Sequence, residues 1–491
     1  MAESHPAHHR KSGALACIGM LAALSGCTLQ GSYSPPAMKM PEKWRESQGA
    51  ARTPDLAPAF PDRWWTALHD PAIDTLVYAA LSDSPTLDEV VARTDEARAV
   101  LRGVGAQRLP SVQVNASTTR QRGAAAVPGE TAISSAADAG LGVSYEIDVF
   151  GRVRESARAA ESRLAARSAE VDSTRLALVA QVAEGVVALR ACAFSARTRA
   201  LDIQSRTQVL ELTRRRVAAG LDARVEESRA TNSLASAHTD AALVEQECER
   251  QTYALEALTG SVEIRSIVLG SDKELRDNTS TFMPDPLPRQ PPLPATVLAR
   301  HPDLLAADRE AAAAWSDIGV ARAARLPRID LSALLTGNWL RAAGSTLDFS
   351  TWSLGSTLTA PLFDGGAGAS NVEAGEARYR AAVARLRQVV RRVVQEVEQA
   401  LAFEDSSRVR VVSAQEALSA AHDTFSVTER RWRGGATSLF ELEDARRQQA
   451  AAEDAAIAAR RDQVQAWIAL MEAIGLATPP LPTRITLTRD E

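Results

Sequence analysis

The feature that most constrains this chain is a duplicated bend between long helices. Two arginines and a glycine recur in the same order 215 positions later, as Arg215, Arg216 and Gly220 and then as Arg430, Arg431 and Gly435. No proline interrupts residues 151–220 or 366–435, and a helix of about 60 residues would be about 90 Å long. The chain therefore predicts two tandem repeats, each folded about one bend, in place of the three domains that 491 residues would otherwise suggest.

Apolar residues in the long segments form narrow stripes at helical spacing, which favours helices packed side by side over helices buried all round. Aromatic residues make up only 4% of the chain, so no large globular core is required. We expect a first repeat at 71–260, with a helical hairpin at about 152–258, and a second at 296–477, with a hairpin at about 367–475.

Each repeat also predicts two β-strands, because its apolar residues change from helical spacing to alternation with polar ones. A polar, alanine-rich loop is expected at about 123–138. The expected strands lie at about 109–120 and 139–150 in the first repeat, and at about 327–340 and 351–363 in the second. The fold class is thus mainly α with a β part of four strands.

Four strands cannot close into a barrel, and an open edge in lipid leaves backbone groups unsatisfied at several kcal/mol each. No run of 18 apolar residues follows Cys27, so we expect no transmembrane helix, and any membrane crossing must use the strands. Oligomerisation supplies the missing strands, since two copies give 8 and three give 12, both even counts found in outer-membrane barrels. The alternative is a sheet in a soluble protein.

The N-terminus reads as a secretion signal over residues 1–26, with basic residues, a short apolar run and small residues. Its end, Leu-Ser-Gly-Cys at 24–27, matches a bacterial lipobox, in which Cys27 becomes the lipidated first residue. Ordinary signal cleavage is the alternative. Thr28 stands where an aspartate would favour retention in the inner membrane, so the outer membrane is the expected destination.

Three further segments lie outside the repeats. Residues 27–70 are rich in proline and small residues and predict an extended arm that leads away from the lipid. Residues 261–295 are also rich in proline and predict a linker, and residues 478–491 form a C-terminal tail.

Composition argues against several classes of function. The net charge of −5 disfavours nucleic-acid binding. Three of the seven histidines lie in the signal segment, and no cysteine or histidine pair has the spacing of metal ligands. The Gly-Gly pairs at 365–366 and 434–435 lack the lysine of a phosphate-binding loop. We therefore expect no enzyme, no metal and no cofactor apart from the covalent lipid on Cys27.

Cys192 and Cys248 each lie 28 residues from Gly220. In an antiparallel hairpin that bends at Gly220 they would reach the same level, and the periplasm favours disulfides. A bridge requires both side chains to face the seam between the helices. Two buried free thiols are the alternative.

Several motifs together resemble the outer-membrane efflux factors of the TolC type, closest to the NodT-like lipoproteins. Besides the lipobox and both bends, they are Trp64-Trp65 with Asp70-Pro71, the stretches at 144–151 and 300–304, and Pro361-Leu362-Phe363-Asp364-Gly365-Gly366. The resemblance implies a homotrimer in which 12 strands form one barrel and 12 helices form one tunnel across the periplasm of a Gram-negative bacterium.

The same resemblance implies an exit duct that exports drugs or other toxic solutes. Its partners would be a periplasmic adaptor and an inner-membrane pump, and it would sit in outer-membrane lipid. Two alternatives are an outlet for type I protein secretion and a periplasmic coiled-coil scaffold without a pore.

The resemblance also places a gate just after the bends, at Phe440, Glu441 and Asp444 and at Glu226 in the first repeat. A ring of Asp444 carboxylates around a three-fold axis would repel one another and favour cations. As an alternative, Glu443 or Asp444 forms an ordinary surface ion pair with Arg447. Some relatives carry a basic residue where this chain has Thr437, so a salt-bridge lock at that position is not expected.

Overall fold

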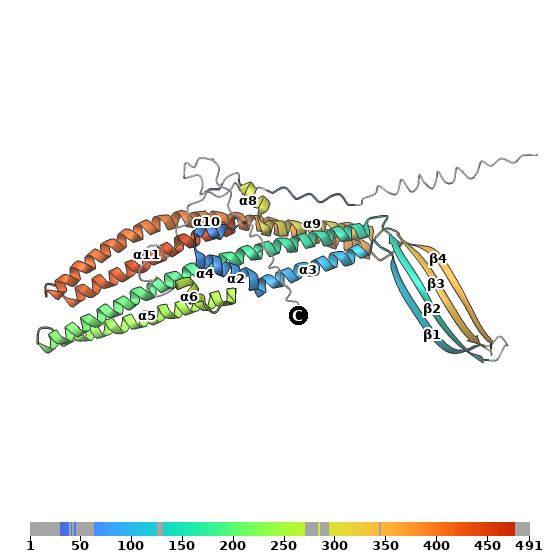
Figure 1. Ribbon diagram of the computed structural model, residues 1–491. Helices are drawn as coiled ribbons and strands as arrows, with labels where there is room; N and C mark the ends of the chain where they lie inside the picture. Colours follow the sequence, from blue (N-terminus) through green and yellow to red (C-terminus); the bar gives the residue numbers. More distant parts are fainter. Residues whose placement is uncertain are drawn as a thin grey trace, which may run out of the picture. The chain divides into compact units, whose positions relative to one another are not determined.

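A computed structural model describes residues 30–38, 41, 44–45, 63–124, 131–270, 283–284, 294–342 and 345–476. Cys27, the signal segment, most of the linker and the C-terminal tail lie outside the described residues. The described chain is mainly helical with one four-stranded sheet (Figure 1). It divides into two compact units, and each is taken by itself below.

The first unit is built on the sheet, which lies within residues 92–168 and 306–388. Its strands are antiparallel in the order β1-β2-β3-β4. They comprise β1 (Ser111–Ala124), β2 (Thr131–Ile147), β3 (Arg328–Ala342) and β4 (Ser345–Thr359). The two predicted hairpins are therefore neighbours in one sheet, joined through the β2–β3 pair.

The register gathers the alternating apolar residues of all four strands on one face. Val112 pairs with Val143, which pairs with Ala333, which in turn pairs with Leu354. This face is exposed in the single chain, as Leu354 shows with 77% of its surface accessible. Polar residues such as Gln113 occupy the opposite face, because side chains alternate along a strand. One face of the sheet is thus mainly apolar, as the alternation predicts. The opposite face is polar or small along β1 and β2 but also carries Leu334, Leu340, Leu347 and Phe349 of β3 and β4.

The expected loop at 123–138 is wrong in extent, because β1 continues to Ala124 and β2 begins at Thr131. Its alanines and serines suggested a loop, since small residues have low strand propensity. In the structure they are paired along the whole ladder, for example Arg120 with Ser135. Backbone pairing with β1 on one side and β3 on the other outweighs the side-chain preference.

Aspartates determine where the strands give way to helices. The Asp148 carboxylate accepts hydrogen bonds from the backbone N–H groups of Val153 and Arg154, at 3.1 and 2.9 Å, and so caps helix α4. In the second repeat Asp364 accepts from Gly366 and Gly368, at 2.9 and 2.7 Å, at the start of α10. Because Asp148 caps α4, strand β2 ends at Ile147, earlier than the expected residue 150.

The second unit contains the two helical hairpins, within residues 169–305 and 389–491. Helix α4 (Arg152–Ala218) and helix α10 (Ala367–Arg433) each have 67 residues and begin in the first unit. Each is followed by a returning helix, α5 (Arg224–Thr259) or α11 (Leu439–Ala473), that runs beside it (Figure 1). These bounds agree closely with the hairpins expected at 152–258 and 367–475.

Shorter elements complete the described part of the chain. They are η2 (Trp64–Leu68), α2 (Pro71–Asp83), α3 (Pro85–Ala106), α6 (Ile264–Leu269), α8 (Pro294–Arg300) and α9 (Pro302–Ala323). Asp70 caps α2 through the N–H groups of Ala72 and Ile73 and forms an ion pair with Arg190 of α4. The extended arm expected at 27–70 is therefore wrong at its end, because residues 64–68 form η2 and Trp64 and Trp65 are buried.

Within the described residues, one helix has the length and composition of a membrane span. An 18-residue window of α4 has a mean hydropathy of 1.6, and 67% of that window is buried inside the structure. A core helix of a soluble protein passes the same test, so this window is weak evidence for a membrane span. It coincides with the apolar stripe that packs the hairpin, where Leu189 and Val186 are completely buried.

Cys192 of α4 and Cys248 of α5 form a disulfide in the structure, with Cα atoms 5.4 Å apart. Both cysteines face the seam between the two helices, where Cys248 is 1% exposed. Of the two alternatives that the sequence leaves open, the bridge is the one present. In the second hairpin the positions 215 residues later hold Ser407 and Gln463, so no such link exists there.

Candidate functional site

The two bends have the same backbone geometry. Gly220 and Gly435 both have φ = +73°, a left-handed conformation that favours glycine. In the first bend, Leu221 N–H donates to the Arg216 carbonyl at 2.8 Å. Ala436 N–H donates to the Arg431 carbonyl at the same distance in the second. Both helices therefore end in the same glycine-dependent cap, which satisfies their last carbonyls.

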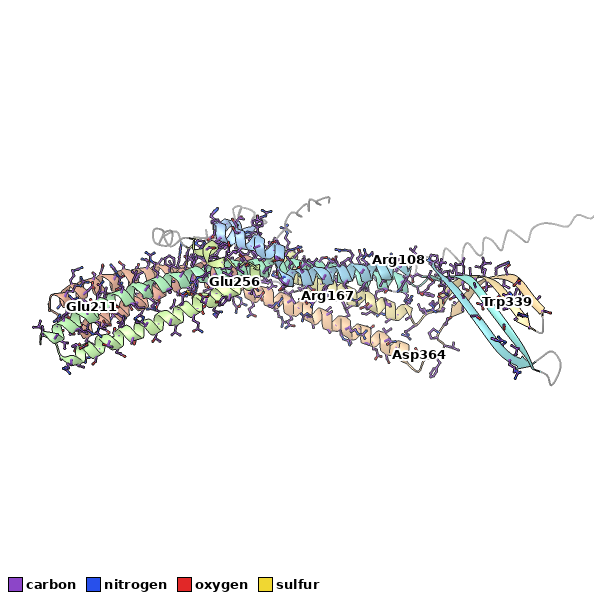
Figure 2. The ribbon with its side chains drawn as sticks, turned by 60° about the horizontal axis from the view of Figure 1, so that its bottom comes forward. Arg108, Arg167, Glu211, Glu256, Trp339 and Asp364 are labelled. Carbon is purple, nitrogen blue, oxygen red and sulfur yellow. A yellow bond between two sulfur atoms is a disulfide. The ribbon has the colours of Figure 1, made fainter. Side chains whose placement is uncertain are left out.

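Beside the bends, apolar side chains from both hairpins form one core. Its buried members are Val209 and Leu210 of α4, Ala230 of α5, Trp432 of α10, and Leu439 and Leu442 of α11. Arg216 lies 5.9 Å from the centre of the Trp432 ring and forms an ion pair with Asp222 at 2.9 Å. The two hairpins are thus packed together at the level of their bends (near Glu211 in Figure 2).

A network of buried charges ties the same two hairpins together. Glu443 of α11 accepts from Arg206 of α4 at 3.0 Å and from Ser233 of α5 at 2.5 Å. It also pairs with Arg446 at 2.9 Å, and Arg446 lies 3.7 Å from Asp202 of α4. Burial lowers the pKa of Arg446, and the Glu443 carboxylate opposes that shift. Two carboxylates and two guanidinium groups therefore balance in charge within the packed seam.

The residues of the expected gate lie at the starts of the two returning helices. Ser438 caps α11 by accepting from Glu441 N–H at 3.2 Å, and Phe440, Glu441 and Asp444 occupy the first turns of that helix. Phe440 is 61% exposed. Glu226 lies in the first turn of α5. In the single chain, the side chains of Phe440 and Glu441 are exposed.

The ordinary ion pair that the sequence offers for Asp444 is present, because Arg447 contacts its carboxylate at 2.9 Å. Both side chains are about half exposed, so the pair contributes only a few tenths of a kcal/mol. Glu443 instead uses Arg206 and Arg446, which corrects its alternative pairing with Arg447. A weak surface pair leaves Asp444 available to other partners.

Two polar atoms at the bends are buried without a hydrogen-bond partner in the described part of the chain. They are the Thr437 hydroxyl oxygen and one carboxylate oxygen of Glu226, whose other oxygen pairs with Arg229 at 2.8 Å. An unsatisfied buried polar group costs about 1–3 kcal/mol. Both of these unpaired atoms lie at the bends, so the bends have less complete hydrogen bonding than the charged network beside them.

Sequence reasoning did not identify the charged network. Arg206 and Asp202 are four residues apart, and Glu443 and Arg446 are three apart, which is the spacing of ordinary surface pairs. One signal was available in the duplication. The positions 215 residues before Glu443 and Arg446 hold Ser228 and Thr231, so these charges belong to one repeat only.

Comparison with known proteins gives a family match over both repeats. The pattern of the family described as "Outer membrane efflux protein" matches residues 76–261 and 293–476, more than half of the chain. The gap between the two matched segments falls on the proline-rich linker.

Individual relatives are similar over almost their whole length. The pyoverdine export outer membrane protein OpmQ of Pseudomonas aeruginosa is 28% identical, with 93% of this chain and 96% of that protein covered. Nodulation protein T of Rhizobium leguminosarum bv. trifolii is 25% identical with the same coverage. Among solved structures, the outer-membrane channel OprN is 27% identical, with a TM-score of 0.78 over 92% of this chain and 100% of that one.

Proposed function

Because the chain belongs to the outer membrane efflux protein family, we propose that it is the exit duct of a tripartite efflux system in a Gram-negative outer membrane. The observation that carries this function is the sheet with one mainly apolar face, joined along the chain to long helical hairpins. An apolar outer face and a polar inner face are what a membrane barrel requires. The proposed activity is passive conduction of drugs or other small toxic solutes, with neither catalysis nor a cofactor.

The duct is completed by copies of the same chain. Among the described residues, β1 pairs only with β2 and β4 pairs only with β3. Each outer edge would therefore leave a row of backbone groups unpaired in lipid. Pairing β4 of one copy with β1 of the next gives a head-to-tail contact, which closes when the rotation forms a ring. Three copies would form a 12-stranded barrel, wide enough to conduct.

The periplasmic end of the proposed duct is closed by the bends. Phe440, Glu441, Asp444 and Glu226 would meet their symmetry copies there and narrow the passage. The buried network around Glu443 supports this role, because it fixes the second hairpin, which carries three of the four residues, against the first. Opening would require that network to part or to move as one body.

The proposed partners are a periplasmic adaptor and an inner-membrane pump, which would deliver solute to the bends. A covalent lipid on Cys27 would add a second attachment to the outer membrane. The relatives support export as the function, since one is named for export of pyoverdine.

Purification from outer-membrane fractions followed by planar-bilayer recording tests the proposal. We expect a trimer that dissociates on heating in detergent and that forms discrete, low-conductance channels. An exclusively soluble monomer without channel activity would support the pore-less scaffold instead. A protein-secretion outlet would be favoured if a deletion strain lost an exported protein while its sensitivity to toxic solutes did not change.

A further inference from the structure

The C-terminal end of α11 lies in a groove of about 620 Å³ within the second unit. Helices α4 and α10 and the residues around the start of α9 form the other walls. The groove is lined by apolar side chains such as Leu176 and Phe403, and by the charged residues Asp303, Arg392, Glu396 and Glu472. Neither the proposed conduction path nor the gate uses this groove.

Carboxylates from every surrounding element face Glu472. They come from Glu184 of α4, Glu396 of α10 and Asp303 of α9. The Arg392 guanidinium is the cation in the groove, and it lies 2.5 Å from Asp303 and 3.7 Å from Glu396. Within the described residues, the Glu472 carboxylate has no hydrogen-bond partner and no ion pair. It is therefore the one acid of the groove wall to which no cation is committed.

His301 supplies no compensating charge to this cluster. Burial lowers the pKa of His301, although Asp303 opposes the shift. Its Nδ1 accepts the Asp303 N–H at 3.3 Å, as a neutral imidazole does. The groove therefore holds more negative than positive charge whenever Glu472 is ionised.

Burial, followed by repulsion from Glu184, Glu396 and Asp303, raises the pKa of Glu472 to about 7. Burial also raises the pKa of Glu184 and of Glu396. A carboxyl group whose pKa is raised on folding stabilises the folded state below its ordinary value, near 4.5. That contribution is lost as the pH rises through about 7. The outer membrane lets protons through, so the proposed location exposes this group to external pH.

The residues next to Glu472 at the end of α11 are closely packed. Leu470 and Met471 are completely buried. Gly475, at φ = +67°, lies so close to His301 that an added Cβ would be 2.7 Å from its ring. A shift of the last turn therefore moves the helix as a body, and that helix begins at Leu439, next to the proposed gate.

We propose that Glu472 and the carboxylates around it form a proton-responsive seat for α11. With Glu472 protonated, the end of α11 packs firmly against α4 and α10, and with Glu472 ionised the seat loosens. Transmission to the bend at the other end of α11 rests on the proposed gate, whereas the seat itself does not.

The seat is tested by hydrogen exchange on the full-length protein in detergent between pH 5 and pH 8. After correction for intrinsic rates, protection of the amides at 466–474 should fall by up to about a hundredfold over this range. The isosteric variant Glu472→Gln should lose this pH dependence and stay protected at pH 8. Glu184→Gln should keep it with a lower midpoint, and Glu416→Gln, an exposed acid on α10, should match the unmodified protein.

The proposal is overturned if Glu472→Gln retains the full pH dependence, or if protection of 466–474 does not change with pH. Planar-bilayer recording of the same variants separates the seat from the gate. Loss of a pH-dependent open probability in Glu472→Gln supports transmission along α11. If protection of 466–474 depends on pH but conductance does not, transmission along α11 is refuted and the proton-responsive seat still holds.

Discussion

The buried network around Glu443 gives a quantitative prediction about opening. We consider Glu443→Gln, which keeps the size of the side chain and one acceptor but removes the charge that faces Arg206 and Arg446. Both guanidinium groups are nearly buried, with Arg446 only 4% exposed at its side chain. Removing one partner of a buried ion pair costs about 3–5 kcal/mol. Because the amide still accepts from Ser233, we expect the lower part of this range, about 3 kcal/mol.

If the network is intact only while the bends are closed, the substitution destabilises the closed state and not the open one. Each 1.4 kcal/mol is about a tenfold change in an equilibrium constant, so about 3 kcal/mol shifts the balance toward the open state by about a hundredfold. Single-channel recording in planar bilayers at fixed pH should show this shift as a higher open probability or a larger mean conductance.

Glu247→Gln is the matched control, because Glu247 forms an exposed pair with Arg250 on α5 at 2.6 Å. It should not change the channel. The double variant Glu443→Gln with Arg206→Gln should be less affected than the sum of the single variants, since the two residues share one network. A Glu443→Gln channel that is less stable to heat but conducts like the unmodified protein would refute the role in gating and leave the network a structural one.

Three further predictions follow from the bends and the disulfide. Replacing Glu441 and Asp444 together by alanine should raise single-channel conductance and weaken cation preference, and unchanged currents would remove both from the gate. Replacing Cys192 and Cys248 by serine should destabilise the first hairpin by about 4 kcal/mol in the loop-entropy account, for a separation of 56 residues; thermal unfolding with and without reductant measures this, and equal midpoints would contradict it. Gly435→Ala should cost about 1–2 kcal/mol, because alanine must adopt a left-handed backbone there, and a neutral effect in denaturant unfolding would show that the bend relaxes.

The periodic parts of this fold could be predicted because periodicity is local. The helical hairpins follow from proline-free runs, apolar stripes and a glycine at each bend, and all of these can be read within a few turns of chain. Alternation likewise predicted the apolar face of the sheet. The order of the strands needed more, since the pairing of β2 with β3 joins residues such as Ser144 and Ser332 that lie far apart in the sequence.

The remaining features depend on tertiary packing. The strand at 131–138 is held by pairing with β1, and from Ser134 onward also with β3, and not by its own alanines and serines. The charges of Arg206 and Glu443 look like surface charges until α4 and α11 are brought together. Glu472 likewise differs from any exposed glutamate only because α4, α10 and the start of α9 surround it with carboxylates.

The disulfide makes the two halves of the duplication mechanically unequal. The disulfide links α4 covalently to α5, whereas Ser407 and Gln463 leave α10 and α11 without a covalent link, joined there by the Arg410–Asp462 ion pair. In a ring of three copies, stiff and compliant hairpins would alternate around the axis. The six hairpins of such a ring would then be similar in shape, as the duplication implies, but would differ in stiffness in two sets of three. In such a ring, any opening movement would fall mainly on the three α10–α11 hairpins, while the three disulfide-linked α4–α5 hairpins would keep their shape.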